Sequence, residues 1–349
     1  MSACQRRLVY LLYGGQADYR WEAKYSLLSL LRQTPREELP QILVYTDRPE
    51  DFHGWPVDLE VLDDNRLKQW RGSQGYMHRL KAAVMHDAFN LPGASIFIDT
   101  DTFFVGSASR LFERLEKADW LVDEVEARWD DWRGERLHDA AAEVLEREYQ
   151  IKGDMPLINS GVLALRNEPD ACMDLAIRLI DEIYPLAPDV HVVEQFAVGC
   201  AAYLRRLGAP ANAQGIVNHY YGDKLFWRLM IAEFFSIHGE EFSERLVAVS
   251  AELPSQRPKP SLLKRLMFRL LAIGLDKQAR KGARAAFFAL QVPGDRYSRS
   301  CAPAYALDCL NALKSEEGEQ DLPPSWRKLL TASQAQRLGD LLEQARKLC

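Results

Sequence analysis

The sequence predicts an α/β fold in which helices flank a mainly parallel central sheet. Short apolar runs alternate with longer segments of helical periodicity, which is the pattern of strands joined by helices. The runs are apolar on both faces, as expected for strands that helices cover on both sides. The chain has 349 residues, of which 47% are hydrophobic, so it can bury a substantial core.

Each predicted element follows from its local pattern. Strand-like runs lie at residues 7–13, 41–45, 57–62, 95–98, 156–165 and 215–221. Apolar residues recur at helical spacing within residues 19–33, 77–89, 166–186, 193–207 and 226–237. The stretch from Asp123 to Arg136 is acidic and rich in tryptophan, and we expect it at the surface, where it could form a mobile lid.

The composition changes after about residue 250. Pro254, Pro258 and Pro260 punctuate a linker, and the segment that follows is basic and helical in pattern. From Arg257 to Arg284 there are nine lysines or arginines against one aspartate, in a chain of net charge −6. We therefore predict an α/β domain over residues 1–250 and a helical, basic module over residues 251–349.

Charge, cysteine spacing and the N-terminal residues argue against several classes of protein. The net charge of −6 argues against bulk attraction to nucleic acid. The six cysteines are widely spaced without a Cys-x-x-Cys pair, so they indicate neither a disulfide framework nor a zinc site. The apolar stretch before Gly14 is too short for a signal peptide or a membrane span. We therefore expect a cytoplasmic protein that binds no nucleic acid.

Asp99 and Asp101 form an Asp-x-Asp pair directly after the strand-like run at 95–98. Two carboxylates at this spacing can reach one cation where a strand gives way to a turn, and oxygen ligands suit Mg²⁺ or Mn²⁺ bridged to phosphates. Such pairs also occur by chance on solvated turns. A phosphatase of the haloacid dehalogenase type is a further alternative, but it has Thr or Val where this chain has Phe103.

Four motifs in order resemble the glycosyltransferases of the GT-A fold. The first runs from Met77-His-Arg-Leu-Lys81 through Leu-Pro-Gly to IFIDTDTFFVGSASRLF. It is followed by Asn159-Ser-Gly-Val162, by Glu194-Gln195 where the family has Asp-Gln, and by a late His-x-x-Gly segment, Val217-Asn-His-Tyr-Tyr-Gly-Asp-Lys224. The likeness covers residues 7–230 and is greatest to the retaining family 8, which includes bacterial lipopolysaccharide galactosyl- and glucosyltransferases and the glycogenins.

The resemblance implies a role for each matching residue. Asp99, Asp101 and His219 would hold Mn²⁺ or Mg²⁺, which neutralises the charge that builds on the departing nucleoside diphosphate. The catalytic residues that line the transferred sugar would be Asn159, Glu194 and Gln195. Contacts to the nucleotide-sugar would come from Tyr13, Gly14, Arg79, Asp99, Thr100 and Lys224.

Three positions depart from the family's pattern. Lys224 stands five residues after His219, where the family's lysine stands six residues after its histidine. Glu194 is one methylene longer than the family's aspartate. The loop at 13–19 replaces an Asp/Asn-rich loop that reads uracil in the family. The metal motif therefore matches the family more fully than the base-reading loop does.

The basic segment at residues 257–284 contains an amphipathic run, Leu262–Leu275. Lys264, Arg265 and Arg269 fall on a helical face of about 140°, and the remaining surface is nearly all apolar. The run is either a helix that docks on the catalytic domain or an interfacial helix that holds the protein at the anionic inner membrane, where lipid-linked acceptors reside. No nucleic-acid-reading motif accompanies it.

Together these features predict a GT-A catalytic domain over residues 1–250. It would move a sugar from a nucleotide-diphosphate donor, by resemblance a UDP-sugar, to a glycan, lipid-linked or protein acceptor, with retention of configuration. One alternative is a non-catalytic relative that binds glycan or nucleotide as a scaffold. Another is a sugar nucleotidylyltransferase, which normally carries a basic glycine-rich loop where this chain has Gly14-Gly15 followed by Gln-Ala-Asp.

Overall fold

The computed structural model describes residues 5–313 and 330–348, and these form two compact units. The N-terminal unit holds the residues up to His219 together with Glu241–Ala248, and the C-terminal unit holds Tyr220–Glu240 and the residues from Val249 onward. The boundary expected at residue 250 lies near the last point where the chain passes between the units. That residues 1–250 form the catalytic domain stays a prediction.

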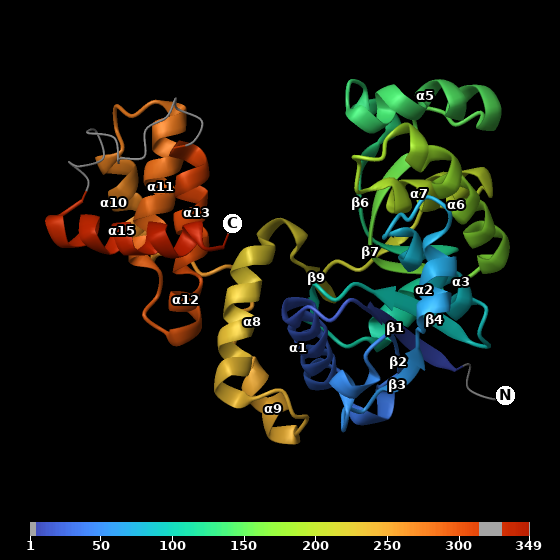
Figure 1. Cartoon of the computed structure of the whole chain (residues 1–349), viewed down its shortest axis with the longest axis horizontal. Helices are drawn as coiled ribbons and strands as arrows, with labels where there is room; N and C mark the ends of the chain where they lie inside the picture. The colour runs from blue at the N-terminus through green and yellow to red at the C-terminus, as the bar shows by residue number, and fades with distance from the viewer. Residues whose placement is uncertain (1–4, 314–329, 349) are drawn as a thin grey trace. The chain divides into compact units, whose positions relative to one another are not determined.

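A seven-stranded sheet forms the centre of the N-terminal unit, with its strands in the order β3-β2-β1-β4-β7-β6-β8 (Figure 1). The strands β3, β2, β1 and β4 are mutually parallel, β7 runs antiparallel to β4 and β6, and β8 is parallel to β6. Their bounds are β1 Arg6–Leu12, β2 Gln41–Thr46, β3 Asp58–Val61, β4 Ala94–Ile98, β6 Trp120–Arg128, β7 Pro156–Leu165 and β8 Ala211–Asn212. The predicted α/β class with a mainly parallel sheet is confirmed.

Helices cover the sheet and join its strands. They are α1 Ala17–Gln33, α2 Asp64–Arg71, α3 Arg79–Phe89, α4 Ser109–Leu115, α5 Arg136–Tyr149, α6 Pro169–Ile183 and α7 Val193–Leu204. The short helix α9, Glu244–Val249, comes after the last described strand. The helix α1 packs on β1, whereas α3, α6 and α7 pack on one another and reach β1, β4 and β7. The helix α1 ends at Gln33 because Pro35 disfavours helical angles at Thr34, which is extended (φ −114°, ψ 123°).

Strand β1 shows how both faces of the sheet are buried. Leu8, Val9 and Tyr10 each have 0% of their surface exposed, although successive side chains of a strand point to opposite faces. Val9 belongs to the large apolar cluster that includes residues of α3, α6 and α7. On the other face, the Tyr10 hydroxyl lies 3.2 Å from Ser26 Oγ of α1. The apolar pattern of the run therefore reflects cover by helices on both sides.

The acidic, tryptophan-rich stretch is not a surface segment throughout. Asp123 is buried within β6, and Trp129 is fully buried at the start of a 3₁₀ turn, Trp129–Trp132. The Trp129 ring stacks on His138 and packs on Phe196, with centroids 4.4 and 4.7 Å apart. The surface prediction is wrong at these two positions, because the many neighbouring carboxylates that remain exposed mask a strand that enters the core.

Every described element of the C-terminal unit is a helix. These are α8 Lys224–His238, α10 Leu262–Leu271, α11 Lys277–Gln291, α12 Arg296–Ser300, α13 Ala302–Leu313 and α15 Ala332–Arg346, with a short 3₁₀ turn on either side of the α8–α9 region. The helices α11, α13 and α15 pack together, and α10 lies against α11 (Figure 1). Side chains of Ser261, Asp276, Asp295 and Thr331 accept hydrogen bonds from backbone amides in the first turns of α10, α11, α12 and α15, which fixes where these helices begin. Among the described residues, no helix is long and apolar enough to cross a bilayer.

Candidate metal centre and surrounding site

The carboxyl ends of β1, β2 and β4 lie at one edge of the sheet, because the three strands are parallel neighbours. Gly14, Asp47 and Asp99 follow these three ends. Ligand sites in open α/β sheets lie beyond the carboxyl ends of the strands. Functional side chains are therefore expected to gather at this edge.

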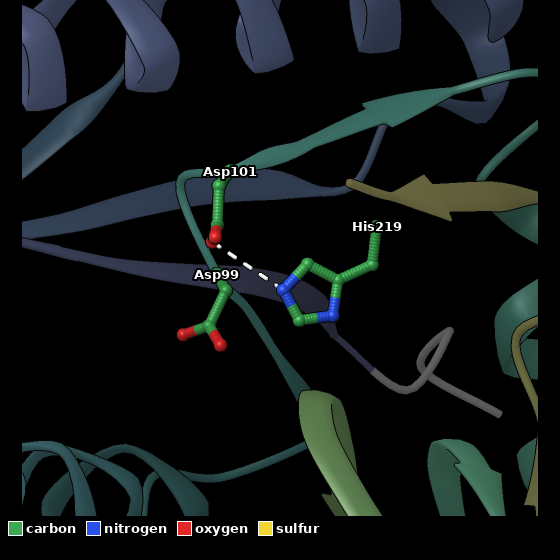
Figure 2. Close-up of side chains that lie close together, drawn as sticks. All are labelled: Asp99, Asp101 and His219. Carbon is green, nitrogen blue, oxygen red and sulfur yellow. Dashed lines mark ion pairs between the residues drawn. The ribbon is translucent and has the colours of Figure 1, made fainter. Parts of the chain in front are cut away.

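Asp99, Asp101 and His219 come together here (Figure 2). The short strand β5 (Thr102–Phe104) pairs antiparallel with β9 (Val217–His219), and His219 lies directly opposite Thr102. One possible ligand atom of each of the three residues lies within 4.8 Å of those of the other two. His219 Nε2 is 3.4 Å from Asp101 Oδ1. The β5–β9 pairing thus brings the late histidine to the Asp-x-Asp turn.

Asp123 of β6 holds the histidine ring from its other side. Its Oδ2 lies 2.8 Å from His219 Nδ1, which leaves Nε2 directed at Asp101. Burial lowers the pKa of His219, but hydrogen bonds to Asp101 and Asp123 outweigh it and raise the pKa to about 10. The imidazole is therefore protonated when only these carboxylates surround it. Asp123 was not predicted as a site residue, because it lies in the stretch expected at the surface.

The Asn-Ser-Gly-Val motif forms an irregularity in β7. Val122 pairs with Leu163 and Glu124 pairs with Asn159, so three residues of β7 lie opposite Asp123 alone. Such bulges redirect side chains and are frequent next to functional sites. In this segment the Gly161 carbonyl accepts a hydrogen bond of 2.8 Å from the Asp99 amide.

Gly161 also makes room for the histidine. A Cβ atom at this position would overlap the His219 ring. The ring is held between two carboxylates and cannot give way without losing one of them. The second and fourth motifs of the sequence are therefore in direct contact, because the His219 ring occupies the space that a side chain at Gly161 would need.

Lys81 of α3 is a buried cation beside the acidic pair. Its Nζ lies 2.8 Å from Asp99 Oδ2, 3.0 Å from Ser160 Oγ and 3.8 Å from Glu194 Oε2. Burial lowers the pKa of Lys81, but the attraction of Asp99 and Glu194 outweighs this effect. The net result is a raised pKa, so the amine stays charged. Lys81 belongs to the first of the four motifs but was not predicted as a site residue. The available signal was a lysine inside an apolar helical run, since buried lysines are rare unless paired.

Glu194 lies in the first turn of α7 and is buried. Its Oε2 accepts a hydrogen bond of 3.1 Å from Ser160 Oγ, and its amide donates to the Tyr76 hydroxyl at 3.3 Å. Burial raises the pKa of Glu194 to about 7, although the charge of Lys81 opposes this. The second oxygen, Oε1, is buried without a hydrogen-bond partner among the described residues. An oxygen in this state can accept a hydrogen bond from a ligand hydroxyl.

Three other predicted residues lie beside this group. Asn159 accepts a hydrogen bond of 3.0 Å from the Gly161 amide and donates one of 2.9 Å to Glu126 Oε1. Gln195 follows Glu194 on α7 and is half-buried, and within the described parts of the chain its side chain has no hydrogen bond. Thr100 is half-buried and lies between Asp99 and Asp101 in the sequence. Their contacts with a sugar or nucleotide stay predictions.

Arg79 is engaged away from the acidic pair. Its guanidinium donates two hydrogen bonds to Asp181 of α6, at 2.7 and 2.9 Å, and a third to the Trp70 carbonyl at 2.7 Å. The basic side chain of α3 that contacts Asp99 is Lys81. Lys224 is the first residue of α8 and belongs to the C-terminal unit. The donor contacts expected of Arg79 and Lys224 stay predictions.

The loop after β1 meets the end of β2 through Asp47. The Gly14 amide donates a hydrogen bond of 3.0 Å to Asp47 Oδ2, and Gly14 has a φ of 86°, which favours glycine. Asp47 Oδ1 is buried without a hydrogen-bond partner in the described chain. Tyr13 is half-buried, with the Arg71 guanidinium 5.8 Å from its ring centroid. Asp47 was not predicted as a site residue, although the Thr-Asp that ends the strand-like run is visible in the sequence.

The chemistry of Asp99, Asp101 and His219 fits a metal ion. Two carboxylates and one imidazole form a mixed oxygen and nitrogen set that several divalent cations accept. Asp123 would hold the imidazole in orientation through its other nitrogen, the usual arrangement around a ligating histidine. Among the described residues, these three side chains form a group of His, Cys, Asp or Glu that lie close enough together to share a metal ion.

Comparisons with known proteins find glycosyltransferases among solved structures. No protein-family model matches the sequence, and no curated protein matches it. The chain is similar to the apo structure of the bifunctional glycosyltransferase WbbM, at 10% identity over 66% of this chain and 51% of that one, with a TM-score of 0.36. It is similar to apo mouse xyloside xylosyltransferase 1 (14% identity, 68% and 84% covered, TM-score 0.33). It is also similar to the galactosyltransferase LgtC in complex with donor and acceptor sugar analogs (10% identity, 72% and 84% covered, TM-score 0.37).

This chain spans about half the length of WbbM. TM-scores of this size carry no inference about activity.

Proposed function

We propose that the chain is a metal-dependent glycosyltransferase that moves a sugar from a nucleotide-diphosphate donor, a UDP-sugar, to a glycan, lipid-linked or protein acceptor. The observation that carries the proposal is the cluster of Asp99, Asp101 and His219 at the carboxyl edge of the parallel strands. These three residues would hold Mn²⁺ or Mg²⁺, which supplies charge neutralisation for the departing nucleoside diphosphate. The four ordered sequence motifs support the same reaction.

Glu194, Asn159 and Gln195 would face the transferred sugar in this proposal. The unpartnered Oε1 of Glu194 would accept a hydrogen bond from a sugar hydroxyl, which removes the cost of a buried unsatisfied oxygen. Lys81 would reduce the repulsion between Asp99 and Glu194, because its ammonium lies within reach of both carboxylates. In the reaction, the bond from the anomeric carbon to the diphosphate oxygen breaks, and a bond to the acceptor hydroxyl forms as that hydroxyl loses its proton. Retention of configuration is part of the proposal.

The nucleoside would bind at the ends of β1 and β2. Tyr13 and Gly14 would contact the base or ribose, and the buried, unpartnered Oδ1 of Asp47 would accept a hydrogen bond from a ribose hydroxyl. Arg79, Thr100 and Lys224 would contact the donor. The proposal also includes a cytoplasmic location with peripheral contact to the inner membrane through residues 257–284.

Isothermal titration with UDP, GDP and their common sugars, with and without Mn²⁺, tests the proposal. We expect Mn²⁺-dependent binding of one nucleotide, lost in Asp99→Ala and kept in the matched control Asp64→Ala, which changes an exposed aspartate of α2. Absence of nucleotide binding in the presence of Mn²⁺ would contradict the transferase and favour a non-catalytic glycan-binding role. Release of pyrophosphate from UTP and a sugar phosphate would instead identify a nucleotidylyltransferase.

A further inference from the structure

A basic cavity of about 940 Å³ lies within the C-terminal unit. Seven lysine or arginine side chains and two carboxylates line it, the latter being Asp223 and Asp308. Both carboxylates pair with Arg257, at 2.7 and 2.9 Å. The six other cations have no ion-pair partner within the described chain, and they are Lys259, Arg265, Arg269, Arg280, Lys281 and Arg284. The cavity therefore carries uncompensated positive charge.

Arg257 differs from the other cations in that two carboxylates already compensate its charge. Its guanidinium carbon lies 3.5 Å from the Phe226 ring centroid and 4.5 Å from that of Tyr305, in addition to its two ion pairs. Arg257 therefore has a structural role, because it holds the proline-containing linker against α8 and α13. Arg265 is in the opposite state, because its Nε is buried without a hydrogen-bond partner among the described residues. A shielded donor of this kind favours an anionic acceptor.

The helix α10 exposes apolar side chains beside this cavity. Within α10 only Phe268 is buried, whereas Leu263 and Leu270 are 78% and 70% exposed, and Ile273 just after the helix is 75% exposed. Leu262, Leu266 and Ile273 also line the cavity. One short segment therefore presents both unpaired cations and a group of exposed apolar side chains.

We propose that this cavity binds the phosphate groups of anionic lipids at a membrane surface, while the exposed apolar side chains of α10 enter the interfacial region of the bilayer. Guanidinium groups bind phosphate oxygens bidentately, and basic side chains are attracted to anionic leaflets. Amphipathic helices of this composition lie in the interface with their apolar side chains among the lipids. This inference rests on the membrane contact proposed above for residues 257–284 and names the lipid phosphates and the cavity that would bind them, whereas it does not depend on glycosyl transfer.

Other occupants satisfy only one of the two features. A second copy of the chain on this face would bring like charges together. Nucleic acid or a soluble polyanion would pair with the cations and leave Leu263, Leu270 and Ile273 in water. An anionic bilayer satisfies both the charge and the exposed apolar surface.

Co-sedimentation of the full chain with vesicles tests the proposal. Vesicles of phosphatidylcholine alone are compared with vesicles that contain roughly one third phosphatidylglycerol. We expect binding to the anionic vesicles only. The double variant Arg269→Gln/Lys281→Gln, which changes two exposed cations of the cavity, is expected to bind at least about tenfold more weakly.

The matched control is Lys264→Gln/Lys277→Gln, which removes the same charge from the same basic segment at positions that do not line the cavity. It is expected to weaken binding less than about threefold. An equal loss in both double variants would show diffuse attraction and overturn the cavity as the site.

The variant Leu263→Ser/Leu270→Ser tests the apolar contribution, and it should fold normally because both side chains are exposed. It is expected to lose vesicle binding with an unchanged circular dichroism spectrum. Equal binding of the native chain to neutral and anionic vesicles would overturn the proposal. So would saturable binding of soluble glycerol phosphate without any binding to vesicles, which would identify a soluble anion as the ligand.

Discussion

The two charged regions of the molecule differ in how their charges are balanced. At the edge of the sheet, Lys81 and His219 are largely buried, and each lies within 4.0 Å of carboxylates of Asp99, Asp101 or Asp123. In the C-terminal cavity, six cations have no acidic partner among the described residues. A charge removed from water must be compensated inside the protein, whereas an exposed charge is stabilised by solvent. The first region therefore suits a small ion that enters the protein, and the second suits a surface that the protein approaches.

The largest expected effect removes one carboxylate of the balanced region. Asp101→Asn keeps the shape of the side chain but removes a ligand charge, and we expect turnover of the donor identified by titration to fall about 10³-fold. Calorimetric titration with Mn²⁺ should show a parallel loss of affinity. Asp64→Asn serves as the control. Turnover and Mn²⁺ affinity within threefold of the native protein would show that the cluster is not the centre of the reaction.

Removing one cation from each region tests whether their charges are balanced differently. Lys81→Met leaves the buried Glu194 and the half-buried Asp99 without their cationic partner, and we expect the free energy of unfolding to fall by about 3 kcal/mol. Lys281→Met removes an exposed cation without an ion-pair partner in the described chain, and a change within about 0.5 kcal/mol is expected. Urea unfolding followed by fluorescence measures both. Similar losses would mean that the two regions are balanced alike.

A smaller effect is expected from Asp123, which touches the centre only through the histidine. Asp123→Asn should weaken Mn²⁺ binding about 10- to 100-fold, the usual result of losing a partner that orients a ligating imidazole. Glu124→Gln, at the next position of β6, is the control and should bind Mn²⁺ normally. The loss of Mn²⁺ affinity in Asp123→Asn should be smaller than the loss in Asp101→Asn, because the Asp123 carboxylate contacts the histidine and not the metal. An Asp123→Asn protein with native affinity would exclude the orienting role.

The smallest effect concerns the pH dependence of stability. The pKa of Glu194 is about 7 in the folded chain against 4.5 for the free side chain, so between these values the folded state holds a proton that the unfolded state lacks. The free energy of unfolding should therefore fall as pH rises through this window, by up to about 1.4 kcal/mol per pH unit from this group. Urea unfolding at pH 5 and 6.5 should show that Glu194→Gln removes this part of the decline.

The control for the pH series is Glu113→Gln, which changes an exposed glutamate of α4. It should keep the native slope. Identical slopes for all three proteins would mean that Glu194 is ionised throughout this range and that Lys81 compensates it fully.

Most strands of the main sheet could be predicted from local pattern. The run at 156–165 coincides with β7, and the run at 95–98 differs from β4 by one residue. Strand β6 was missed because its second half alternates with exposed carboxylates, which look like a surface loop in a single sequence. The two-residue strand β8 is too short to leave a pattern. Strands with an apolar run of their own were thus predictable. Strands that lack such a run and form by pairing with neighbouring strands were not.

The site was predictable to the same extent. Asp99, Asp101 and His219 could be identified from a strand end and from motif order. Lys81 and Asp123 could not, because their significance depends on which distant side chains they meet. Likewise, the count of basic residues between 257 and 284 indicated a cationic module, but only the packing of α10 and α11 determines which of these cations share one cavity.

Gly161 and His219 have a consequence for how this chain can change over time. The imidazole occupies the space that any side chain at position 161 would need. A mutation at either position therefore alters what is tolerated at the other, although they belong to different motifs. A lineage that lost the histidine would be free to accept a larger residue at 161, and could not regain the histidine until the glycine returned. The order of substitutions at these two positions would therefore decide whether the cluster of Asp99, Asp101 and His219 can be recovered.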